Sequence, residues 1–191
     1  MSATSAPFGL RPSFHPSGLD RAVALPNGIT STYGTGILKG QPVALDTNGN
    51  IITATAGSAY QGAFAGQEYT DLNGRRIVSN QWIAGTSYQT GSQVTYYYSD
   101  PNIVYDIQAN GSLAQSSIGD QANFVSVSAG STTTGLSQCM ISTSLAGSSA
   151  VGDMRIIGLT PAVDNAWGDA YTVVQVQVSR SQFVATINAI A

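Results

Sequence analysis

Short β-favouring segments separated by turn signals dominate the chain from residue 41 onwards, and they limit what it can fold into. Residues 42–45 and 50–55 flank the sequence Asp46-Thr47-Asn48-Gly49. Asn-Gly supplies the positive φ angles that tight hairpin turns need, so this region predicts a β-hairpin. Residues 171–178 alternate, with Val174, Val176 and Val178 on one face and Gln175 and Gln177 on the other. That alternation predicts a strand with one buried face.

Other short apolar segments continue the pattern, at 60–66, 75–78, 81–83, 93–98, 102–108, 123–127, 138–141 and 154–159. Gly62 and Gly66 within the first of these indicate bends or a close backbone approach. Residues 114–119 could form one helical turn. Eight to ten short strands with regular turns predict an all-β fold, a small barrel or sandwich of antiparallel strands with at most short helices. The segment from Phe183 to Ile190 fits a helix and a strand alike.

The N-terminal segment, residues 1–40, differs from the rest. Five of the seven prolines lie within the first 42 residues, and no helical or strand period is sustained there. We therefore predict an extended arm over residues 1–40 and a β-rich body over residues 41–191. Spaced apolar side chains, including Phe8, Leu10, Phe14 and Leu19, indicate that the arm lies along another surface, either its own body or a neighbouring protein.

The low charge of the chain favours assembly and argues against other partners. Charged residues make up 9% of the sequence, against roughly 25% in ordinary soluble domains. Neutral polar groups can exchange water for hydrogen bonds to a partner at little cost, which suits a subunit that neighbours cover. The net charge of −3 and the scattered cations provide no stripe for nucleic acid. No apolar run is long enough for a membrane helix. Residues 1–7 do not resemble a secretory signal, which predicts synthesis in the cytoplasm.

No residue pattern in the sequence predicts catalysis. The single histidine, His15, lies between Phe14 and Pro16 in the predicted arm, so a Ser-His-Asp triad is possible only formally. The carboxylates that could act as a glycosidase pair are Asp100, Asp106, Asp164 and Asp169. Each lies at a turn or a strand edge, where Asp is expected for local hydrogen bonds. Cys139 is the only cysteine and reads as a small buried residue. The prediction is a protein that is not an enzyme.

Metal and nucleotide motifs are incomplete. Asp46 to Asn50 resembles the start of a calcium loop, but Gly57 stands where that loop needs a bidentate Glu. Residues 164–169 place oxygen ligands close together, although turn chemistry explains them more simply. Residues 130–135 have the glycine spacing of a P-loop without the following Lys. We therefore expect no metal and no cofactor.

One region resembles a known family. Residues 40–46 (Gly-Gln-Pro-Val-Ala-Leu-Asp), 50–54 (Asn-Ile-Ile-Thr-Ala) and 60–66 (Tyr-Gln-Gly-Ala-Phe-Ala-Gly) resemble the lambda-type head decoration proteins of tailed bacteriophages over about residues 20 to 70. Those proteins have a Pro/Gly-rich arm followed by a comparable series of strands. Further segments, 7–12, 98–102, 131–136 and 155–159, are similar to longer cement-like proteins of other tailed phages.

The resemblance implies a β-tulip-like domain and a homotrimer at the three-fold positions of an expanded capsid. It implies that the arm contacts the major capsid protein, so the protein would lie on the outer surface of the virion and stabilise the phage head. The residues of the arm expected to make this contact are Phe8, Leu10, Arg11, Phe14, His15 and Leu19.

Two other functions remain open. The first is a different virion protein from the tail, a fibre or an adaptor; a fibre would be expected to show internal repeats, and the sequence has none. The second is a carbohydrate-binding β-sandwich with Trp82, Trp167 or the cluster Tyr96 to Tyr98 as sugar platforms. Strand alternation places Tyr97 on the opposite face from Tyr96 and Tyr98, so part of that cluster is expected to be core.

Overall fold

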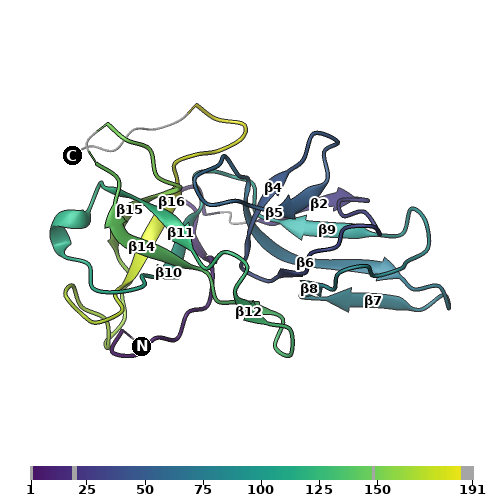
Figure 1. The fold of residues 1–191 in the computed structure, drawn as a ribbon, viewed down its shortest axis with the longest axis horizontal. Helices are drawn as coiled ribbons and strands as arrows, with labels where there is room; N and C mark the ends of the chain where they lie inside the picture. The colour runs from purple at the N-terminus through teal and green to yellow at the C-terminus, as the bar shows by residue number, and fades with distance from the viewer. Residues whose placement is uncertain (1, 19–20, 148, 186–191) are drawn as a thin grey trace.

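The computed structural model describes residues 2–18, 21–147 and 149–185, and it is built almost entirely of short antiparallel strands. Two six-stranded sheets lie side by side along the long axis of the molecule (Figure 1). We call them the C-terminal sheet and the N-terminal sheet. Neither closes into a barrel within the described residues. The predicted all-β class is therefore confirmed as an open, sandwich-like arrangement of antiparallel strands.

The C-terminal sheet has its last strand in sequence near its middle. In spatial order it contains β1 (Arg11–Phe14), β10 (Val104–Gln108), β16 (Val173–Val178), β15 (Met154–Leu159), β11 (Gln121–Val125) and β14 (Met140–Leu145). The sheet curls, so that Ala109, just after β10, forms a parallel bridge with Ile141 in β14. The curled face encloses the larger apolar core. Val174, Val176 and Val178 point into this core, as their alternation predicted.

The N-terminal sheet is built around the nine-residue strand β6. Its spatial order is β2 (Val23–Pro26), β9 (Val94–Tyr97), β6 (Gly62–Thr70), β4 (Pro42–Leu45) and β5 (Ile51–Thr53), and β7 (Arg76–Ser79) also pairs with β6. A separate, smaller core lies against this sheet and includes Ile29, Phe64 and Trp82.

Two strand pairs and one helical turn complete the fold. The pairs are β3 (Ile37–Leu38) with β8 (Gln81–Trp82) and β12 (Gly130–Ser131) with β13 (Leu136–Ser137). The single helical turn predicted at 114–119 is the 3₁₀ turn η1 (Gln115–Ser117). Of the segment 183–190, whose structure the sequence left open, residues 186–190 lie outside the described residues.

The N-terminal segment, for which the sequence predicts an extended arm over residues 1–40, contributes one strand to each of the two sheets. Residues 11–14 form an edge strand of the C-terminal sheet by pairing with β10, and residues 23–26 form an edge strand of the N-terminal sheet by pairing with β9. Ile29 and Ile37 are completely buried. Of the two surfaces that the sequence allowed for this segment, the described residues occupy the protein's own body, because the open edges of both sheets accept their backbone hydrogen bonds.

A buried carboxylate joins the two sheets. Asp153, which directly precedes β15, is fully buried, and its oxygens accept the backbone N–H groups of Gly57 at 2.9 and 3.0 Å and Phe124 at 3.0 Å. Gly57 follows β5 of the N-terminal sheet, and the guanidinium of Arg180 donates to its carbonyl oxygen. Burial raises the pKa of Asp153 above its ordinary value, while the two N–H donors and Arg180 oppose that rise. Both carboxylate oxygens therefore accept backbone hydrogen bonds, which connect the loop after β5 to β11.

Two hairpin loops share one hydrogen-bonded design. Asp46 Oδ1 accepts the backbone N–H groups of Asn48 and Asn50, both at 2.8 Å. Asp71 Oδ1 accepts those of Asn73 and Arg75, both at 2.9 Å. Both loops read Asp-x-Asn-Gly, and Gly49 and Gly74 have φ values of 81° and 83°. The sequence predicted both turns, and the Asp caps explain why an acidic residue opens each one.

We expect the double variant D46N/D71N to be less stable than the wild type at neutral pH only. The backbone donors of Asn50 and Arg75 lower the pKa values of Asp46 and Asp71 below the ordinary 3.8. A lowered folded-state pKa contributes stability above the unfolded pKa, and that contribution disappears as the pH falls through the folded value. Urea unfolding across a pH series measures this. A stability difference that stayed constant down to about pH 2 would contradict the assignment.

Candidate binding site

A pocket opens where the N-terminal segment crosses between the two sheets. Its volume is about 250 Å³, and the residues that line it are Phe8, Leu10, Arg11, Pro12, Lys39, Gly40, Phe64, Tyr98 and Leu136. Backbone hydrogen bonds hold its walls together: Leu10 N donates to Gly40 O at 2.8 Å, and Gly40 N donates to Phe64 O at 2.8 Å. The pocket is therefore built into the fold, because the segments that form it belong to the hydrogen-bonded framework.

The pocket has apolar walls and a cationic rim. Phe64 and Leu10 are buried, Phe8 and Tyr98 are half-buried, and Lys39 is exposed. The guanidinium of Arg11 lies 4.7 Å from the centroid of the Phe8 ring, and its Nη2 donates to Asp106 Oδ2 at 3.0 Å. Arg11 is thus fixed by an aromatic face and a carboxylate, and it braces Phe8 at one wall.

The structure divides the six residues predicted to contact a capsid. Phe8, Leu10 and Arg11 come together at the pocket. Leu10, however, is only 1% exposed and belongs to the larger core, so in this structure its side chain packs inside its own protein. Burial in the core removes the apolar surface of this leucine from water, which stabilises the fold.

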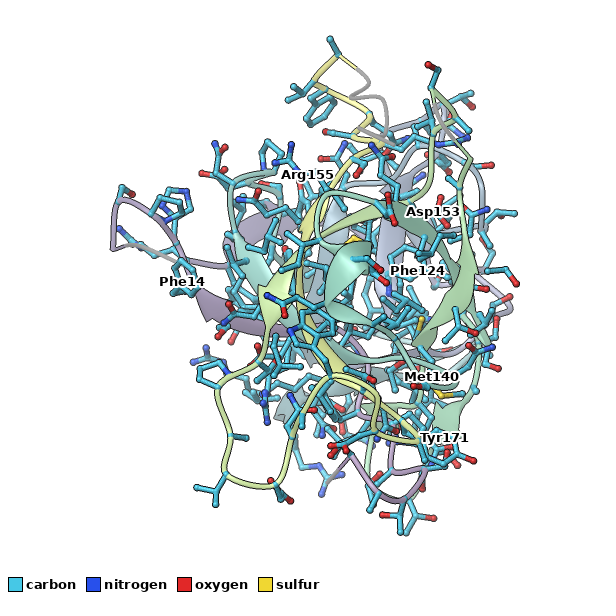
Figure 2. The ribbon with its side chains drawn as sticks, turned by 90° about the vertical axis from the view of Figure 1, so that its left-hand side faces the viewer. Phe14, Phe124, Met140, Asp153, Arg155 and Tyr171 are labelled. Carbon is cyan, nitrogen blue, oxygen red and sulfur yellow. The ribbon has the colours of Figure 1, made fainter. Side chains whose placement is uncertain are left out.

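Phe14 and His15 do not line that pocket. Phe14 is 46% exposed at the end of β1, and Figure 2 shows it at the edge of the molecule, well away from Phe124 and Asp153. His15 Nε2 lies 3.0 Å from Asp100 Oδ2, which ties the chain after β1 to the turn before β10. Leu19, the sixth predicted contact, lies outside the described residues.

His15 takes part in a local arrangement that superficially resembles a catalytic triad. Its Nδ1 lies 2.6 Å from Ser17 Oγ, while Asp100 lies at Nε2. Nδ1 also accepts the backbone N–H of Ser17 at 3.0 Å. The lone pair that a general base would use is therefore already occupied by a turn hydrogen bond, so the geometry is that of a capped turn.

The carboxylates weighed as catalytic pairs are also held by local partners. Asp106 accepts from Arg11 and, at 2.9 Å, from the hydroxyl of Thr160. Asp169 accepts from Ser2 and from the backbone N–H of Ala166 at 2.7 Å, and these hydrogen bonds lower its pKa. Across the part of the chain that the structure describes, no cluster of three His, Cys, Asp or Glu side chains could hold a metal ion.

Most of the aromatic residues considered as sugar platforms face inwards. Trp82 is 1% exposed and packs in the smaller core, so it cannot stack on a sugar. Trp167 packs against the larger core, and Tyr97 is buried while Tyr96 is half-buried, as the strand alternation predicted.

The part of the chain that the structure describes contains no apolar helix of the length that a membrane crossing requires.

Sequence reasoning missed Lys39, Phe64, Tyr98 and Leu136 as parts of one site. They are far apart in sequence, and only the pairing of strands brings them together. Lys39 N donates to Gly135 O at 2.9 Å and Lys39 O accepts from Ser137 N at 3.0 Å, which seats the β12–β13 hairpin beside the pocket. The single lysine of the chain was the one sequence feature that could have drawn attention to this position.

Comparisons with protein-family models, with curated proteins and with solved structures found no match.

Proposed function

We propose that this protein is a structural virion subunit, a cement (decoration) protein that attaches to the lattice of a major capsid protein and stabilises a phage head. The observation that carries the proposal is the exposure of the two N-terminal edge strands. Most residues of β1 and β2 are exposed, and Phe14 and Val23 keep 46% and 45% of their surface accessible. Peripheral strands that present apolar side chains are typical of surfaces that a protein partner covers.

The weakly charged composition supports the same proposal. A surface of hydroxyl and amide groups loses little when a partner replaces water, and the chain has few ionic groups to desolvate. The carboxylates and the histidine weighed for catalysis are engaged in turns and strand contacts, which fits a binding role. We further propose that the subunit assembles as a homotrimer, in line with the family resemblance.

The purified wild-type protein should co-sediment with expanded capsids of its phage. The double variant F14S/V23S should bind at least about tenfold more weakly, since apolar anchors at interfaces typically contribute 1–3 kcal/mol each. The matched control is V163S/L72S, which alters two apolar residues that are exposed elsewhere. Sedimentation of the isolated protein at micromolar concentration measures the trimer. Absence of the wild-type protein from the capsid pellet would contradict the cement function, and a strict monomer would contradict the trimer.

A further inference from the structure

We propose that the pocket beneath the N-terminal segment receives one aromatic or large aliphatic side chain with a carboxylate beside it, presented by the lattice partner. This inference rests on the proposed function, because it names the chemistry that the partner would insert. It assigns a role to Lys39 and Leu136, which neither the motifs nor the exposed strands β1 and β2 explain.

The size of the pocket fits a single large side chain. A protein cavity of about 150 Å³ accommodates benzene, whereas this pocket has about 250 Å³. The pocket is open on one side, so a side chain of another protein can enter it without displacing core residues. Phe8, Phe64 and Tyr98 supply aromatic walls, and aromatic pairs add attraction beyond the area that they bury.

The charge at the rim favours a carboxylate. Arg11 already pairs with Asp106, so the local cation that remains available is Lys39. Lys39 is exposed, and no carboxylate of residues 2–18, 21–147 or 149–185 forms an ion pair with it. An acidic group on the occupant would complete this pair while its neighbouring apolar group fills the pocket.

The position of the pocket favours a protein partner over a free small molecule. Arg11 and Pro12 line the pocket and are also the first two residues of β1, the exposed edge strand. A partner that covers Phe14 at the other end of this four-residue strand therefore passes close to the pocket mouth. The backbone hydrogen bonds of Leu10, Lys39 and Gly40 keep the pocket walls in place before binding, which limits the entropy lost on association.

The first experiment uses two probes of nearly the same size and shape, the charged N-acetylphenylalanine and its neutral amide. Each is titrated into the isolated full-length protein and followed by two-dimensional NMR. We expect both to shift the signals of pocket residues, with the acid binding about threefold to fivefold tighter, as an exposed ion pair permits. In K39Q the two affinities should become equal. In L136W the larger ring should block both probes, with L136A as the control that keeps the pocket open.

The second experiment asks whether the capsid uses the same pocket. K39E should lower the amount of protein that pellets with capsids at least threefold, whereas the exposed-charge control R75E should not. Loss of wild-type pelleting itself would refute the cement function and leave the probe result intact. Equal binding of acid and amide by the wild type would overturn the pocket chemistry. A charge preference in the probe titration with unchanged pelleting of K39E would show that the pocket takes free carboxylates, and would overturn the assignment to a protein partner.

Discussion

A Gly62→Ala protein is expected to lose at least about 3 kcal/mol of unfolding free energy. A Cβ atom at position 62 would lie 2.1 Å from the carbonyl oxygen of Tyr98 and 3.0 Å from the hydroxyl oxygen of Tyr105. Tyr98 cannot retreat easily, because its N–H donates to Ala63 O at 2.9 Å and the preceding strand β9 pairs with β6. Urea unfolding followed by tryptophan fluorescence measures the loss.

Gly34→Ala provides the matched control for that measurement. No heavy atom lies within 4 Å of the Cβ position at Gly34, and its φ is not positive. We expect a change of at most about 0.5 kcal/mol there. If G62A and G34A unfolded at the same urea concentration, the close approach between residues 62 and 98 would be wrong.

Deleting residues 1–20 is expected to destabilise the whole protein by at least about 3 kcal/mol. The division into an arm and a separate body, which the sequence predicts, would instead leave a folded body that only loses its contact arm. The structure changes this expectation because the deletion removes Leu10 from the larger core and the whole of β1 from the C-terminal sheet. It also removes Ser2, which bonds to Asp169 and accepts the N–H of Tyr171 through its carbonyl oxygen at 2.8 Å. Circular dichroism during thermal unfolding measures the effect.

Two point variants separate the contributions within that deletion. L10A should account for about 2–4 kcal/mol, the usual cost of truncating a buried leucine. F14A should cost less than about 1 kcal/mol, because Phe14 is 46% exposed. If the truncated protein were as stable as the wild type, residues 1–20 would form an arm that the fold does not need.

The alternation of apolar and polar residues predicted strands that have one buried and one more exposed face. β16 begins two residues inside the segment 171–178, where alternation predicted a strand, and β15 has the bounds of the short apolar segment 154–159. The hairpin of β4 and β5 follows from Asn-Gly at its turn. These elements are set by local rules, namely alternation and turn chemistry, which neighbouring residues carry in full.

The N-terminal strands were missed for a physical reason. β1 contains Pro12 and β2 contains Pro26, and proline is normally evidence against a strand because it has no N–H to donate. Edge strands tolerate it, since one side of their backbone faces no partner. Whether an extended segment is an edge strand depends on where an open sheet edge lies, and the local sequence does not carry that information. The pocket was missed for the same reason, because its walls come from five separated parts of the chain.

The place of β16 in the C-terminal sheet has a consequence for synthesis on the ribosome. Among the described residues, β16 is the last strand to be made, yet it lies between β10 and β15 and pairs with both. β1 is made first, but it can pair only after β10 has been made, since β10 is its partner and Arg11 lies opposite Asp106 in their register. The sheet therefore cannot close its core until residue 178 has left the exit tunnel. Until then, strands made earlier keep unpaired edges and exposed apolar faces, the kind of surface that chaperones protect from aggregation.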